Sequence, residues 1–85
     1  MNEEVGKNIA KCRKMYGISQ KHLASKAGIS SQGLLKIEKG QVSPKADTLA
    51  KIMIVLAITP NQLFGVEQIT EENSSLIERL RRLRG

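Results

Sequence analysis

The chain begins with short amphipathic stretches, in which apolar residues recur at helical spacing. In the first stretch the apolar residues Val5, Ile9, Cys12 and Tyr16 are separated by four, three and four positions, which places them on one face of a helix. This pattern predicts a helix over residues 3–16.

Four more helices are predicted from the same kind of pattern and from the residues that mark helix ends. Ser19, Ser30 and Thr59 are suitable N-caps, since their hydroxyls can accept a backbone N–H of the first turn, and glycines follow the predicted ends. Pro60 and Gln62 complete the signature of a capping box. The predicted helices cover residues 20–27, 31–39, 45–56 and a short segment from Pro60 to about Phe64-Gly65.

No stretch alternates with period two for more than a few residues, so no sheet is expected. The fold class predicted is all-α: a compact body of five short helices in residues 1–65, followed by a different segment in residues 66–85.

Residues 66–85 predict a C-terminal amphipathic helix that is capped by Thr70. Leu76, Leu80 and Leu83 share one stripe of it. Extended backwards to Ile69, the heptad pattern has Asn73 and Leu80 at a positions and Ile69, Leu76 and Leu83 at d positions. About two heptads are too short to be stable alone. The segment is therefore expected to dimerise, to contact a partner protein, or to fold back on its own domain.

Ile54 and Val55 lie roughly opposite the apolar stripe of the predicted fourth helix. A plain bundle would leave both in water, so an apolar cover is expected over at least one of them. The C-terminal helix and a second subunit are the two candidates.

The net charge of the chain is +6, and it is unevenly distributed. Residues 1–65 contain ten Lys and Arg against four Asp and Glu, whereas residues 66–85 contain four of each. A basic domain favours a polyanionic partner, although a solvated lysine-rich surface would have the same composition. Aromatic residues are scarce, which argues against a protein that stacks single-stranded bases.

Residues for catalysis or metal binding are lacking. His22 and Cys12 are the single histidine and the single cysteine, so neither a Cys/His metal set nor an internal disulfide is expected. No phosphate-binding loop occurs, and neither an enzyme nor a cofactor is predicted. The longest apolar run, residues 49–58, is too short to span a membrane. Without a signal sequence, the expected location is cytoplasmic.

The segment SQKHLASKAGISSQGLLKIEKG, residues 19–40, places two short helices on either side of a three-residue turn. Such helices must cross steeply, and small residues such as Ala24 allow close contact. Leu34 and Ile37 then bury the back of the second helix of the pair, and its polar front faces outward.

This segment resembles the helix-turn-helix of the phage-repressor-like family, the Cro and lambda-repressor type. The likeness extends from about Gly6 to Phe64 and implies a lambda-repressor-like fold. The matching residues are Gln20, Leu23, Ala24, Gly28, Ser30, Leu34, Ile37, Glu38 and Gly40.

The resemblance implies a role for individual residues. Residues 31–39 are then the recognition helix in the major groove of DNA. The residues expected to contact base edges are Ser31, Gln32 and Lys36, whose side chains suit this chemistry. Those expected to contact the DNA backbone are Gln20, Lys39, Gln41 and Lys45. Arg13 and Glu38 match a buried structural ion pair.

Two residues depart from the family pattern. Gly33 replaces a residue that usually carries a polar side chain; the glycine allows close approach to DNA or leaves one base unread. Leu35 occupies a usually polar, outward position, where it would touch a thymine methyl group, contact a partner protein or remain exposed in isolation.

These observations predict a sequence-specific regulator of transcription, a repressor or autoregulator, that binds double-stranded DNA as a homodimer. The surface proposed for the dimer or a partner includes Ile54, Val55, Leu76, Leu80 and Leu83. Two alternatives remain: the antitoxin of a toxin–antitoxin pair, and a helix-turn-helix module that contacts only proteins.

Overall fold

The computed structural model of the chain describes residues 2–70, which form five helices without a strand. The all-α fold and the number of helices in the body are confirmed, and their ends agree with the prediction to within one or two residues. The C-terminal helix predicted from Thr70, with Leu76, Leu80 and Leu83, lies outside the described residues. The helices are α1 (Asn2–Met15), α2 (Gln20–Ala27), α3 (Ser31–Glu38), α4 (Ala46–Leu56) and α5 (Pro60–Leu63).

The predicted N-caps form. The hydroxyl of Ser19 accepts the N–H of His22 at 3.0 Å. At α5 the capping box is complete, because the Thr59 hydroxyl accepts the N–H of Gln62 while the Gln62 side chain accepts the N–H of Thr59. Each cap satisfies backbone donors that have no partner inside the helix, which explains why these helices begin at these residues.

The helices enclose one hydrophobic core. The predicted inward residues within α1, α2 and α3 are buried. Tyr16, predicted on the face of the first helix, follows the end of α1 and packs against the core while remaining partly exposed, as do Leu49 and Met53 of α4. Burial raises the pKa of the Cys12 thiol, because the thiolate would lose its hydration, and a hydrogen bond with Tyr16 opposes this shift. The fully buried large side chains are Ile9, Leu23, Leu34, Ile52, Leu56 and Leu63.

The core extends beyond α5. Ile69, which the heptad pattern would assign to the C-terminal helix, is only 5% exposed and belongs to the core of the body. Val66, close to it in sequence, is 78% exposed. After the exposed residues that follow α5, the chain therefore returns to the bundle at Ile69.

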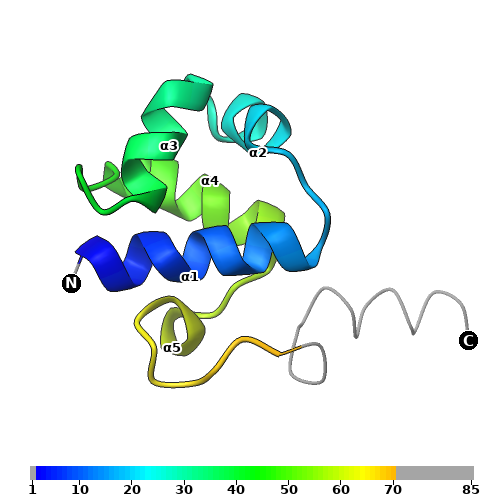
Figure 1. Cartoon of the computed structure of the whole chain (residues 1–85), viewed down its shortest axis with the longest axis vertical. Coiled ribbons are helices and arrows are strands. Elements are labelled where there is room, and N and C mark those ends of the chain that lie inside the picture. Colours follow the sequence, from blue (N-terminus) through cyan, green and yellow to red (C-terminus); the bar gives the residue numbers. More distant parts are fainter. Residues whose placement is uncertain (1, 71–85) are drawn as a thin grey trace, which may run out of the picture.

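α1 and α3 approach each other closely at a glycine. A Cβ atom at Gly6 would overlap with the carbonyl oxygen of Ile37 and lie 2.8 Å from that of Glu38. Only glycine permits this spacing, so Gly6 fixes how α3 rests on α1. In Figure 1, α2 and α3 lie at the upper end of the molecule, α1 crosses the middle and α5 lies below it.

None of the helices in the described part of the chain is long and apolar enough to cross a membrane.

Candidate nucleic-acid interface

α2 and α3 are joined by a tight turn at Gly28. This residue has φ +72°, in the left-handed region that glycine adopts without strain. The turn is closed by backbone hydrogen bonds from Gly28 to Ser25 at 3.2 Å and from Ile29 to Ala24 at 3.0 Å. The N–H of Gly33 then donates to the Ser30 hydroxyl at 3.0 Å, which begins α3 directly after the turn.

α3 has a buried back and an exposed front. Leu34 is fully buried and Ile37 is 5% exposed, and these two side chains anchor the helix to the core. Ser31, Gln32 and Lys36 are all exposed. The structure therefore brings the three residues predicted to contact base edges onto one open surface.

Three of the residues predicted to contact a DNA backbone surround the end of α3. Lys39 is its C-cap, Gln41 lies in the following turn and Lys45 is the N-cap of α4. All three side chains are exposed.

Gln20 differs from the other predicted backbone contacts. It is the first residue of α2 and half-buried, and its amide nitrogen donates to Oε1 of Glu38 at 3.0 Å. One N–H of that amide is therefore used inside the protein.

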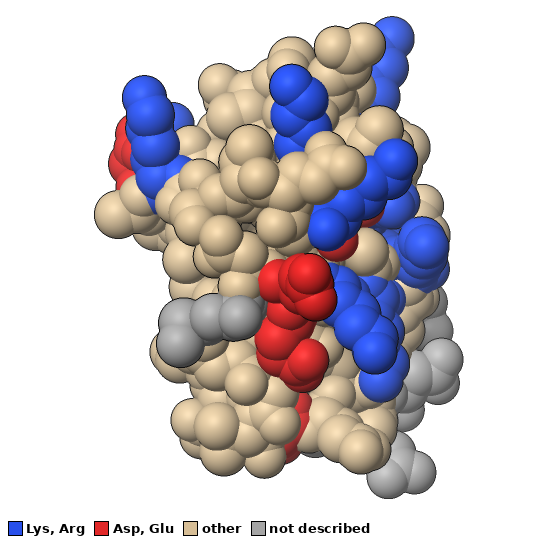
Figure 2. Space-filling view, turned by 60° about the vertical axis from the view of Figure 1, so that its left-hand side comes forward, with Lys and Arg blue, Asp and Glu red and all other residues tan. Residues whose placement is uncertain are grey.

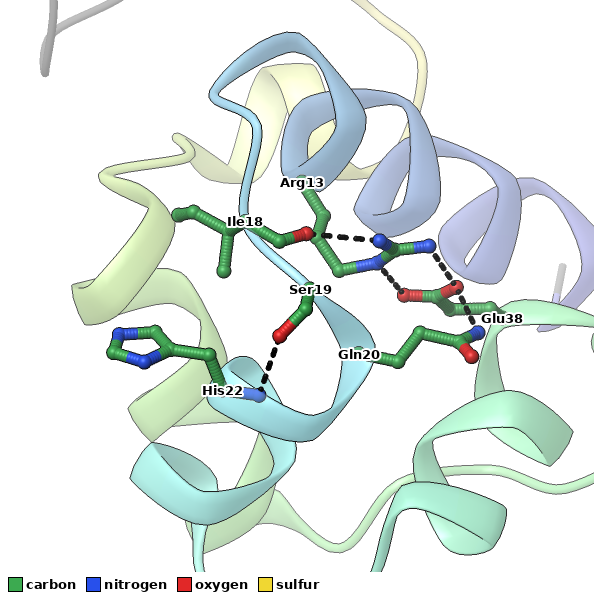
Figure 3. Close-up of polar contacts among 6 residues, drawn as sticks. All are labelled: Arg13, Ile18, Ser19, Gln20, His22 and Glu38. Carbon is green, nitrogen blue, oxygen red and sulfur yellow. Dashed lines mark hydrogen bonds and ion pairs between the residues drawn. The ribbon is translucent and has the colours of Figure 1, made fainter.

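Arg13 and Glu38 lie together in an ion pair that links four segments (Figure 3). Arg13 Nε donates to Glu38 Oε2 at 2.8 Å, and its Nη2 donates to Glu38 Oε1 at 3.1 Å. The remaining nitrogen, Nη1, donates to the carbonyl of Ile18 at 2.9 Å. Arg13, Glu38 and Gln20 together form a clamp. It connects α1, the turn before α2, α2 itself and the last residue of α3.

The clamp is mostly shielded from water. The side chains of Arg13 and Glu38 are 10% and 5% exposed, and every buried side-chain nitrogen and oxygen in the described part of the chain has a hydrogen-bond partner. A bidentate pair of this kind fixes orientation as well as distance. α3 is therefore held at both ends, by the Ser30 cap and by the clamp.

Basic side chains surround this surface. Figure 2 shows Lys and Arg over the upper part of the molecule, where α2 and α3 lie, and along one flank, whereas the lowest end, at α5, shows none. Arg13–Glu38 is the one ion pair between residues that the structure describes. Among the described residues, no carboxylate therefore lies within ion-pair distance of the lysines of α3 and its flanking turns, although Glu3 lies against Gly40 at the end of α3.

The predicted partner surface is placed only in part. Ile54 is 75% exposed on α4, whereas Val55 is half-buried against the core. Phe64, 48% exposed, and Val66 add apolar surface near the end of α5 that the sequence pattern did not single out. No group of three His, Cys, Asp or Glu side chains within residues 2–70 is arranged to hold a metal ion.

Sequence reasoning missed two features next to α3. One is the contact of Gly6 with α3, for which the single signal was a glycine in the middle of an amphipathic pattern. The other is a hollow beside Gly33, for which the sequence contains no signal.

Two short helices joined by a tight turn, of which the second has a buried back and an exposed polar front, are typical of a DNA-binding helix-turn-helix protein. The basic side chains around this front fit the same class. The sequence model described as "Helix-turn-helix" (HTH_3) matches residues 9–63. The chain therefore belongs to the helix-turn-helix family of DNA-binding transcriptional regulators, which are not enzymes.

Relatives of the chain include two phage-related proteins. It is 32% identical to the SPbeta prophage-derived uncharacterized HTH-type transcriptional regulator YonR of Bacillus subtilis, over 85% of this chain and 73% of that protein. It is 31% identical to the cryptic phage CTXphi transcriptional repressor RstR of Vibrio cholerae, over 94% of this chain and 70% of that one.

A third relative is considerably longer than the matched region. The chain is 28% identical to the HTH-type transcriptional regulator PuuR of Escherichia coli, over 85% of this chain but only 39% of PuuR. No solved structure matches the chain with comparable significance.

Proposed function

We propose that this chain is a sequence-specific regulator of transcription that binds double-stranded DNA through α3 and acts as a repressor or autoregulator. The observation that supports this best is the construction of α3. Its back is buried and its last residue is held by the Arg13–Glu38 clamp, while its polar front is open within a basic surface. A short, rigidly mounted helix of this kind fits the major groove, which is about 12 Å wide.

Individual contacts follow from side-chain chemistry. Gln32 is suited to a bidentate contact with adenine and Lys36 to donation to guanine, and Ser31 adapts to either base. Lys39, Gln41 and Lys45, which are exposed around the end of α3, would contact phosphates on one side of the groove. Gln20 retains a second amide hydrogen for a phosphate after its bond to Glu38.

We infer that the chain acts as a homodimer inside the cell. One domain of this size contacts few bases and phosphates, so two copies on a two-fold symmetric site would supply the affinity, with half-sites about 34 Å apart. Residues 1–65 would contain the DNA-binding unit. The dimer or partner surface would comprise Ile54, Val55, Leu76, Leu80 and Leu83. The repressor role is supported by the relative RstR, which is described as a transcriptional repressor.

The proposal is tested by binding to random duplex DNA at several salt concentrations, measured by fluorescence anisotropy. Because Lys and Arg release counterions from phosphates, affinity should fall steeply with salt, with a log–log slope of several. A flat response, or no binding, would contradict the proposal and favour a module that contacts only proteins.

A further inference from the structure

A hollow of about 360 Å³ opens on one side of α3, between this helix, the turn at Gly28 and the segment that precedes α4. Polar residues of segment 43–48 form part of its wall. The rest of the lining lacks polar side chains and comes from Gly28, Ile29, Gly33, Ile37, Val42 and Pro44.

Gly33 forms part of the lining of this hollow. Apart from its chain neighbours and the backbone of its own helix, a Cβ atom at Gly33 would meet only the Ser30 hydroxyl, at 3.2 Å, so no side chain from another helix occupies the space beside this residue. Across the hollow, Val42 is 41% exposed. An apolar wall is therefore left in contact with solvent next to the recognition helix.

This hollow is continuous with the surface that would read DNA. Gly33 directly follows Gln32 and lies within one helical turn of Lys36, and Lys45 lines the hollow as well. A duplex contacted by these side chains would cover the opening. On the floor of the major groove, the apolar group available to contact the apolar wall of the hollow is the 5-methyl group of thymine.

We propose that the hollow receives the 5-methyl group of a thymine in the half-site, with Val42 as the main apolar contact. This inference rests on the proposed function and extends it. The polar side chains Ser31, Gln32 and Lys36 would read hydrogen-bonding groups, while Gly33 and Val42 add a preference for thymine at a neighbouring position.

The test uses a duplex selected from a random pool by the full chain. Each thymine of the half-site is replaced in turn by deoxyuridine, which keeps base pairing and removes only the methyl group. At one position the replacement should weaken binding about fourfold, the value of one buried methyl group. With Val42→Ala, sensitivity to that replacement should fall to less than twofold.

Leu35→Ala is the matched control. Leu35 is 37% exposed and lies on the other side of the row formed by Gln32 and Lys36, at 100° per residue around α3. Its replacement should leave the effect of deoxyuridine unchanged. The inference is overturned if no thymine is sensitive, or if Leu35→Ala removes the sensitivity while Val42→Ala does not. Failure of the proposed function would be distinct, since the full chain would then bind no duplex at all.

Discussion

Gln32 and Lys39 are both exposed, but they offer different chemistry to DNA. The amide of Gln32 can pair with the edge of one base, whereas the ammonium of Lys39 is a point charge that suits any phosphate. Gln32→Ala should therefore weaken preferred sequences by about 1–3 kcal/mol and leave random DNA almost unaffected. Lys39→Ala should weaken all sequences alike and lower the salt slope by about 1. Anisotropy titrations on selected and random duplexes measure both, and an equal loss for both variants on every sequence would refute this division.

Gly6 and Gly33 both lie within helices, but a methyl group should affect stability very differently at the two positions. Alanine normally stabilises a helix by about 0.5–1 kcal/mol relative to glycine. At Gly6 this gain is outweighed by overlap with the backbone of α3, so Gly6→Ala should destabilise the protein by about 1–3 kcal/mol or more. Gly33→Ala meets one hydroxyl and should change stability by less than about 1 kcal/mol. Urea unfolding followed by circular dichroism distinguishes these outcomes, and equal midpoints for the two variants would show that α1 and α3 can move apart at little cost.

At the scale of elements, the Arg13–Glu38 clamp fixes the position of the end of α3 relative to α1 and α2. Glu38→Ala would leave the Arg13 guanidinium buried without its partner and remove the acceptor of Gln20, so it should cost about 3–5 kcal/mol of unfolding free energy. The double variant Arg13→Met with Glu38→Leu removes both charges and should cost less than Glu38→Ala alone. Urea midpoints measure the series. A loss below about 1 kcal/mol for Glu38→Ala would mean that the pair behaves as an exposed one.

At the scale of the whole molecule, the open question is which surface joins two copies. A truncation after Thr70 keeps the core residue Ile69 and removes the leucine stripe of residues 71–85. If that stripe forms the dimer, sedimentation equilibrium should find the truncated chain monomeric at concentrations where the full chain is dimeric. A dimer that survives the truncation would transfer the role to the exposed apolar residues of the body, Ile54, Phe64 and Val66.

A shorter truncation, after Val66, is a useful comparison because it also removes Ile69. Loss of this buried side chain should lower the unfolding free energy by about 1.5–3 kcal/mol. The truncation after Thr70 should keep the stability of the core, so comparing the two truncated chains distinguishes a loss of association from a loss of folding.

The helices and their ends could be predicted from the sequence because the responsible forces are local. The hydroxyl of Ser19 or Thr59 accepts an N–H only three residues away, and the spacing of apolar residues decides which face each helix buries. The same local rules, together with the family resemblance, placed Ser31, Gln32 and Lys36 on the exposed front of α3.

The tertiary structure decided what depends on residues that are distant along the chain. Glycine is needed at position 6 because the carbonyls of residues 37 and 38 lie against it. The side-chain amide of Gln20 is held by a hydrogen bond to the carboxylate of Glu38, which is 18 residues away. Ile69 follows the heptad pattern of the C-terminal segment, yet its burial depends on how the body of the protein packs. A sequence determines hydrogen bonds and faces within one element through short-range geometry, whereas close approaches and hollows between elements exist only once the helices have packed.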